Sequence, residues 1–365
     1  MTPEWALPLQ QAFITFFNYL FQAFTAFKQY DSPLFWPFLV SALVIGAIAW
    51  RITNSGASWR EFRNRYFGRA LWWHPSARAD YLYYIVNAVF FPVVVGPALF
   101  TGAMMSGWLD KVLAPWIGPF APAGEAGFAL RVIYTVVSFI AYDLGRFVAH
   151  SAQHDIPLLF EFHKVHHSAE VLTPFTAFRS HPVDLALMAW STALLTGLAT
   201  WGFQRITGES ISYYTFLQLQ VLLWVFSLTD NLKHWQVWIS YGPFLNRWLI
   251  SPAQHQLHHS AETRHFGINR GFEIAVWDRL YGTLVLPIRG ETFRMGLGDG
   301  TDGSWHSIAR IYFWPFGLVW RRLFDHPGRS GTELGAETDS LKQSKDDQQY
   351  RCDDADAVVA RCKPD

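Results

Sequence analysis

Cysteine and charge are both scarce in this sequence. Its only cysteines, Cys352 and Cys362, lie in a polar C-terminal segment, so the rest of the chain has neither a disulfide framework nor a thiolate metal site. Any bound metal must therefore rest on histidine and carboxylate ligands. Lys+Arg and Asp+Glu each number 29 among the 365 residues, so no excess of charge favours nucleic acid as a partner.

Apolar and aromatic residues take the place of the missing charge. Hydrophobic residues make up 51% of the chain, aromatic residues 17% and charged residues only 16%, which is too apolar for an ordinary soluble protein. No basic stretch precedes the first apolar run, so we expect no cleavable signal peptide. Residues 10–27 are instead expected to form an aromatic-rich helix in the membrane interface.

Several apolar runs are long enough to cross a bilayer, whose hydrocarbon core of about 30 Å needs roughly 20 helical residues. Four runs carry no charge and a fifth carries only Arg131. In chain order they are residues 34–50, 81–109, 126–142, 185–204 and 211–229. The sequence therefore predicts an all-α, multi-span integral membrane helical bundle with about four to five spans.

Basic residues predict the orientation of these spans. Residues 51–70 contain five arginines and one glutamate, which is typical of a cytoplasmic loop. When the five spans are counted alternately from this loop, every histidine motif described below falls on the cytoplasmic side. We therefore expect a histidine-rich helical cap on the cytoplasmic face, holding a dinuclear metal site.

Eight of the 14 histidines fall into three short motifs. The motifs are His150-x-x-x-His154, His163-x-x-His166-His167 and His255-x-x-His258-His259. Helical residues three and four apart have neighbouring side chains, about 5–6 Å apart, so each motif can aim two or three imidazoles at a common point. Chance would give roughly 0.02 copies of H-x-x-H-H in this chain, and two are present.

Eight convergent imidazoles exceed what one zinc ion uses, so the motifs favour two metal ions. Imidazole suits zinc, copper, iron and nickel, and the ligands alone do not name the metal. A site beside membrane spans has lipid as its natural substrate, and oxidation of an unactivated C–H bond requires a redox metal with dioxygen. Two iron ions with O2 as co-substrate fit best. Carboxylates are expected to fix the histidine tautomers, with Asp143, Asp184, Asp230 and Asp278 as candidates.

These motifs and their surroundings resemble the fatty acid hydroxylase and sterol desaturase superfamily, whose signature is H-x3-4-H followed by two copies of H-x2-H-H. The resemblance includes Asp143 and Arg146 before the first motif. It extends through HHSAEVLTPFTAFRSHPVD, which begins at His166, to WDRLYGTLVLP after the third motif. It covers roughly residues 135–287.

The resemblance implies a di-iron, O2-dependent oxidoreductase at the cytoplasmic face of the membrane, with the eight motif histidines as metal ligands. It also implies a ninth ligand, His234, because family members commonly place a further histidine before the third motif. Candidates for further residues that bind metal or orient a metal ligand are His181, Asp143, Asp230 and His265. The histidines that fall outside the pattern, which we expect to be surface residues, are His74, His306 and His326.

The implied reaction is hydroxylation or desaturation of a lipid such as a fatty acyl chain or a sterol, in lipid biosynthesis or modification. The sequence does not separate these two outcomes. It has no flavin or dinucleotide glycine fingerprint, no haem motif and no iron–sulfur cysteine spacing, so electrons must come from a separate reductase, ferredoxin or cytochrome.

Two alternatives to this reading remain open. One is a zinc-dependent membrane hydrolase, which would bind zinc and show no dependence on oxygen. The other is a non-catalytic metal-binding membrane protein that transports or stores metal. A transport path needs polar groups within the spans, and the last two predicted spans carry no charge, which disfavours transport.

Composition and the extent of the resemblance together divide the chain into four segments. We expect an N-terminal membrane region over residues 1–134 and a fatty acid hydroxylase-like catalytic domain over 135–287. An interfacial aromatic segment over 288–324 and a disordered polar tail over 325–365 complete the chain.

Overall fold

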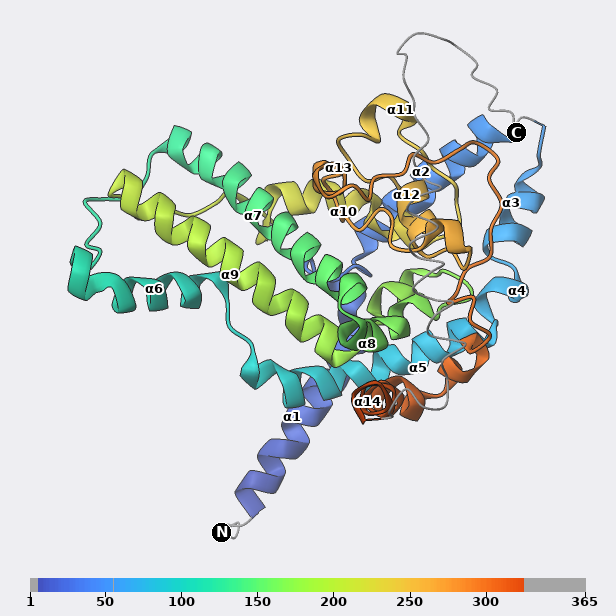
Figure 1. The fold of residues 1–365 in the computed structure, drawn as a ribbon, viewed down its shortest axis with the longest axis horizontal. Helices are drawn as coiled ribbons and strands as arrows, with labels where there is room; N and C mark the ends of the chain where they lie inside the picture. The colour runs from blue at the N-terminus through green and yellow to red at the C-terminus, as the bar shows by residue number, and fades with distance from the viewer. Residues whose placement is uncertain (1–5, 55, 325–365) are drawn as a thin grey trace. The chain divides into compact units, whose positions relative to one another are not determined.

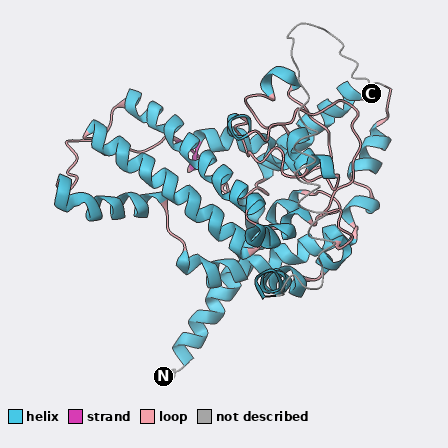
Figure 2. Cartoon of the chain, in the orientation of Figure 1, coloured by secondary structure: helices cyan, strands magenta, loops and turns pink. Residues whose placement is uncertain are grey.

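The computed structural model describes residues 6–54 and 56–324, and the predicted disordered tail lies outside them. The described residues up to Trp320 form one compact unit. Helices dominate the described residues (Figure 2). The α-helices are α1 (Ala6–Thr25), α2 (Trp36–Thr53), α3 (Trp59–Tyr66), α4 (Arg69–Trp72), α5 (Pro75–Phe90), α6 (Gly102–Ile117), α7 (Phe128–Asp155), α8 (Pro157–His167), α9 (Pro182–Thr207), α10 (Val221–Lys233), α11 (Gly242–Leu245), α12 (Pro252–His258), α13 (Val276–Tyr281) and α14 (Ile308–Phe324).

Four helical stretches among the described residues are long and apolar enough to cross a membrane. They are residues 36–53, 75–117, 128–155 and 182–207. Many apolar side chains on these helices are exposed, including Val40 on α2, Ile133 on α7 and Leu194 on α9, as contact with lipid requires. The predicted fold class, a helical multi-span membrane protein, is confirmed.

The second of these stretches is bent. The α-helical geometry ends at Phe90. The chain then forms a π-helical turn (Phe91–Val95) and a short 3-10 turn (Gly96–Ala98), and becomes α-helical again in α6. Pro92 and Pro97 lack the N–H that a continuous helix needs, which explains the break. Figure 1 shows the chain changing direction between α5 and α6.

The prediction of a fifth span over residues 211–229 is wrong. Its first half forms two short antiparallel strands, β1 (Thr215–Phe216) and β2 (Leu219–Gln220), joined through Leu217 and Gln218 in the left-handed region, with φ of 47° and 64°. The Gln220 side chain then accepts hydrogen bonds from Leu222 N and Leu223 N and starts α10. This helix has 13 residues, about 20 Å, and is too short to cross the core. Residues 211–229 therefore do not form one continuous membrane-spanning helix.

Helices α7 and α9 lie side by side along much of their length (Figure 1). Gly145 allows this close approach, because a Cβ atom there would lie 2.7 Å from Thr192 Cα on α9. Small residues at such contacts let helix backbones approach in membranes. Helix α10 packs on α2, where Ser41 Oγ donates to Leu228 O over 2.7 Å. These contacts bring the ends of α7 and α10 that carry histidines toward one region.

The first predicted interfacial segment is helical, and the second forms a long helix only over residues 308–324. The N-terminal one is α1, which exposes Phe13, Phe17 and Phe21. The C-terminal aromatic run belongs to α14, whose buried side includes Ile311 and Tyr312. Their location in a membrane interface stays a prediction.

Candidate metal centre

Helices α7, α8 and α12 position the three histidine motifs. His150 and His154 lie one turn apart near the end of α7, with ring centroids 4.9 Å apart. The chain then turns at Ile156 and starts α8 with Pro157 at its first position, a favoured site for proline. Helix α12 begins with a capping box in which Ser251 and Gln254 satisfy each other's backbone N–H groups. The end of one long helix and two shorter helices therefore present the imidazoles.

The described residues contain two groups of histidines whose ring nitrogens lie within 4.8 Å of one another in each group. The first group is His150, His154, His163, His167 and His258, and the second is His166, His234, His255 and His259. All nine are buried except His154, which is half-buried. The structure thus brings together all eight motif histidines and His234, which follows α10.

The two H-x-x-H-H motifs are divided between the groups. His163 and His167, four residues apart, join the first group, whereas His166 faces the second. In the third motif, His255 and His259 join the second group and His258 joins the first. The expectation that each motif points at one common place is therefore wrong for these two motifs. Residues four apart share a face more closely than adjacent ones, so each motif connects both groups.

The ring nitrogens fit a bound cation. Nε2 of His150 lies 3.0 Å from Nε2 of His163 and 3.1 Å from Nε2 of His258. In the second group, Nε2 of His255 lies 3.1 Å from Nε2 of His234. Two nitrogens bound at right angles to one ion, each at about 2.1 Å, lie about 3 Å apart. The spacing of these nitrogens matches that requirement.

The protonation of the imidazoles supports the same fit. Burial, with a smaller contribution from the neighbouring His166, lowers the pKa of His258 and of His234 to about 3. Burial also lowers the pKa of His166 to about 4, although the hydrogen bond to the Arg179 backbone raises this pKa. At neutral pH these imidazoles are uncharged, so unprotonated nitrogens are available to a metal ion.

Backbone carbonyls fix several tautomers. His150 Nδ1 donates to Arg270 O over 2.6 Å, and His258 Nδ1 donates to Ile268 O over 2.7 Å. His166 Nδ1 donates to Arg179 O over 3.1 Å. With the proton on Nδ1, Nε2 of each ring is free to bind metal, which is the usual arrangement for metal-binding histidines.

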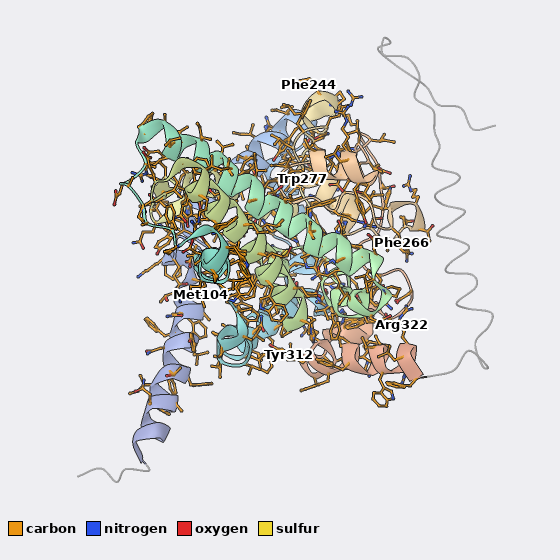
Figure 3. All side chains as sticks on the ribbon, turned by 60° about the vertical axis from the view of Figure 1, so that its left-hand side comes forward. Met104, Phe244, Phe266, Trp277, Tyr312 and Arg322 are labelled. Carbon is orange, nitrogen blue, oxygen red and sulfur yellow. The ribbon has the colours of Figure 1, made fainter. Side chains whose placement is uncertain are left out.

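One of the four candidate carboxylates contacts a motif histidine directly. Asp184 Oδ2 lies 3.3 Å from His163 Nδ1. Asp143 instead accepts from the backbone N–H groups of Glu273 and Ile274 and from Trp277 Nε1, the last over 2.9 Å (Trp277 is labelled in Figure 3). This carboxylate holds the loop that follows the third motif.

Asp278 clamps the same loop from its other side. Its two oxygens accept from Arg270 N and Gly271 N, each over 2.7 Å. Because Arg270 O orients His150, Asp278 acts on the histidine group through the backbone.

Asp230 lies outside both groups and forms part of an ion cluster beside them. Lys233 Nζ lies 3.0 Å from Asp230 Oδ1 and 2.7 Å from Glu273 Oε1. Burial raises the pKa of Asp230, but the charges of Lys233 and Arg146 outweigh it and lower that pKa to about 2. Asp230 is therefore a carboxylate at neutral pH, and it is one helical turn from His234.

His181 and His265 lie outside both groups. His181 caps α9, because its Nδ1 accepts from Val183 N over 3.1 Å while its Nε2 donates to Tyr312 O over 3.1 Å. His265 Nε2 lies 3.2 Å from Glu291 Oε1. His74 and His306 are also outside the groups, and His326 lies outside the described residues.

Sequence reasoning gave no role to Arg179, which is fully buried behind the second motif. Its Nη1 pairs with Asp80 Oδ1 over 2.7 Å, and its Nη2 donates to Trp305 O over 2.9 Å. Its Nε donates to Val165 O over 3.0 Å, inside the motif itself. The available signal was Asp80, a charged residue next to a long uncharged run that needs a buried partner.

Comparison with known proteins agrees with this geometry. Residues 135–283 match the family model for fatty acid hydroxylase. The ornithine lipid hydroxylase OlsE of Rhizobium tropici is 27% identical over 181 residues, 48% of this chain and 50% of that protein. A Delta(7)-sterol 5(6)-desaturase of Gibberella zeae is 28% identical over 146 residues, 39% of this chain and 40% of that protein. An alkylglycerol monooxygenase of Danio rerio is 25% identical over 204 residues, 53% of this chain and 39% of that protein.

The matched region spans half or less of the length of these three relatives. No solved structure matches the chain significantly.

Proposed function

Because residues 135–283 belong to the fatty acid hydroxylase and sterol desaturase superfamily, we propose that the protein is a membrane di-iron oxygenase that hydroxylates or desaturates a lipid. It would use O2 and electrons from an external donor. The observation that carries the proposal is the pair of buried histidine groups, five and four imidazoles with converging nitrogens. The named relatives act on an ornithine lipid, a sterol and an alkylglycerol, which supports a lipid substrate.

Nine histidines would hold the two iron ions, divided as in the two groups above. Bound iron supplies the redox chemistry that lets dioxygen oxidise a C–H bond. The chain's own contribution is to keep the imidazoles neutral through burial and to orient them through Arg270 O, Ile268 O and Arg179 O. Burial of the groups also excludes water from the reaction.

The cytoplasmic location of the centre is part of the proposal. The arginine-rich segment after α2 forms α3, whose Phe62 and Tyr66 pack against Trp235, with ring centroids 6.3 and 5.8 Å apart. Trp235 directly follows His234. The segment that the distribution of arginine assigns to the cytoplasm therefore packs next to the second histidine group, which supports a cytoplasmic centre and a cytoplasmic electron donor.

A comparison of cell lipids tests the reaction. Cells expressing the wild type, His258→Ala or His306→Ala would be grown with isotopically labelled dioxygen, and their lipid extracts analysed by mass spectrometry. We expect a lipid product in wild-type and His306→Ala cells that is absent with His258→Ala. Gain of one labelled oxygen indicates hydroxylation, and loss of two hydrogens indicates desaturation. Identical lipids in wild-type and His258→Ala cells would contradict the proposal.

A further inference from the structure

A cavity of ≈ 190 Å³ lies between α7, α10 and the start of α2. Its lining is apolar toward the start of α10, at Leu223 and Phe226, and charged toward the end of this helix, at Asp230; Phe38 and Arg146 also line it. This volume is smaller than the roughly 300–1,000 Å³ of pockets that enclose a drug-sized ligand. The cavity therefore suits a polar headgroup of a few atoms with an attached chain leaving along the apolar side.

The polar side of the cavity adjoins the metal centre. Arg146 precedes His150 by one helical turn on α7, and Asp230 on α10 lies four residues before His234, which directly follows this helix. Residues four apart share a helix face, so both charges lie beneath histidines of the two groups. Arg146 Cζ stacks 3.7 Å from the centroid of the Phe272 ring, which in turn lies 5.1 Å from the His150 ring. A single aromatic ring thus separates the arginine from a histidine of the first group.

Charges of both signs remain available to a ligand here. Lys233 is fully engaged, because its Nζ contacts Phe272 O, Glu273 Oε1 and Asp230 Oδ1 within 3.0 Å. Arg146 is not, since its nearest carboxylate oxygen, Glu273 Oε1, is 3.8 Å away and its guanidinium makes no hydrogen bond within residues 6–54 and 56–324. The Asp230 side chain keeps 32% exposure, with only Oδ1 paired to Lys233.

We propose that this cavity binds the headgroup of a zwitterionic amphiphile, with an anionic oxygen on Arg146 and an ammonium group on Asp230. The acyl chain would lie along Phe38, Leu223 and Phe226. A guanidinium and a carboxylate in one pocket match opposite charges in one ligand, and such charge-assisted hydrogen bonds are the strong ones. The inference rests on the proposed function in one respect: if the protein oxidises the bound lipid, the oxidised carbon lies close to the headgroup.

The test measures binding to the purified full-length protein in detergent by native mass spectrometry titration. Three probes share a palmitoyl chain: lysophosphatidylethanolamine, O-palmitoyl serine and monopalmitoylglycerol. We expect at least one zwitterion to bind about tenfold tighter than the neutral glyceride, since a hydrogen-bonded charge pair is worth about one order of magnitude or more. Preference for the first zwitterion identifies a phosphate headgroup, and preference for the second identifies an amino-acid headgroup.

Variants connect the preference to the cavity. Arg146→Gln and Asp230→Asn are each expected to remove the preference while leaving binding of the glyceride unchanged. Leu223→Trp fills the apolar side and should weaken binding of all three probes without altering the charges. Arg131→Gln, on the same helix but outside the cavity, should change none of the affinities. Equal binding of all three probes, or an unchanged preference in Arg146→Gln, would overturn the inference.

Metal content measured on the same samples keeps this inference separate from the proposed function. Bound iron without a zwitterion preference would overturn the inference alone. A zwitterion preference in a protein that never binds iron would contradict the proposed function alone.

Discussion

Removing the Asp80 carboxylate should destabilise the protein strongly. Both Asp80 and its partner Arg179 are buried, and Arg179 Nη1 lies 2.7 Å from Asp80 Oδ1. In Asp80→Ala the guanidinium keeps its carbonyl partners Val165 O and Trp305 O but loses the opposite charge. An uncompensated buried charge costs about 3–5 kcal/mol. The Arg179→Met change in the same background removes that charge, so the double variant should recover part of the loss.

The free energy of unfolding would be measured by SDS titration in mixed micelles, with thermal unfolding as a second readout. Iron content should fall as well, because Arg179 O holds the His166 ring in place. The reasoning would be refuted by an Asp80→Ala protein within about 1 kcal/mol of the wild type. It would also be refuted if the double variant lost as much as the two single changes added together.

Two further predictions concern pH and packing. The folded protein holds the pKa of His234 and of His258 near 3, below the ordinary 6.5. Between these two values the unfolded chain binds more protons than the folded protein does. The free energy of unfolding therefore falls as pH falls through this range, by about 1.4 kcal/mol per pH unit for each histidine. The metal-free protein should therefore unfold at a lower temperature at pH 5 than at pH 7.5, and equal unfolding temperatures would refute this. Gly145→Ala should cost about 1–3 kcal/mol because its Cβ would press on Thr192, whereas Gly202→Ala, with open space around it, should not destabilise in thermal unfolding.

Much of the fold follows from hydrophobicity and charge. Three runs without charge, and one run whose only charge is Arg131, located the four candidate spans, because a charged group inside lipid costs free energy. The same rule failed at residues 211–229. This run has no charge, as a span would, but it contains neutral polar residues and a turn at Leu217 and Gln218. Turn geometry in such a run depends on backbone conformation, which hydropathy does not report.

The sequence predicted the residues of the candidate metal centre but not how they are arranged. Spacing identified the eight motif histidines, and the resemblance added His234. The separation of His166 from His163 depends on His234 and His259 lying beside His166, which spacing alone does not determine. The groups that orient the rings were also hidden, because Ile268 O and Arg270 O are backbone carbonyls that every residue possesses.

The most direct test of the central claim is the metal content of the purified protein. Wild type, His258→Ala, His255→Ala and the control His306→Ala would be expressed with ample iron under reducing conditions, purified in detergent and analysed by elemental mass spectrometry. The account predicts about two irons per chain in the wild type and the control, and clearly fewer in the other two variants, each of which loses a ligand from a different group. A single zinc ion, or no metal, in the wild type would contradict it.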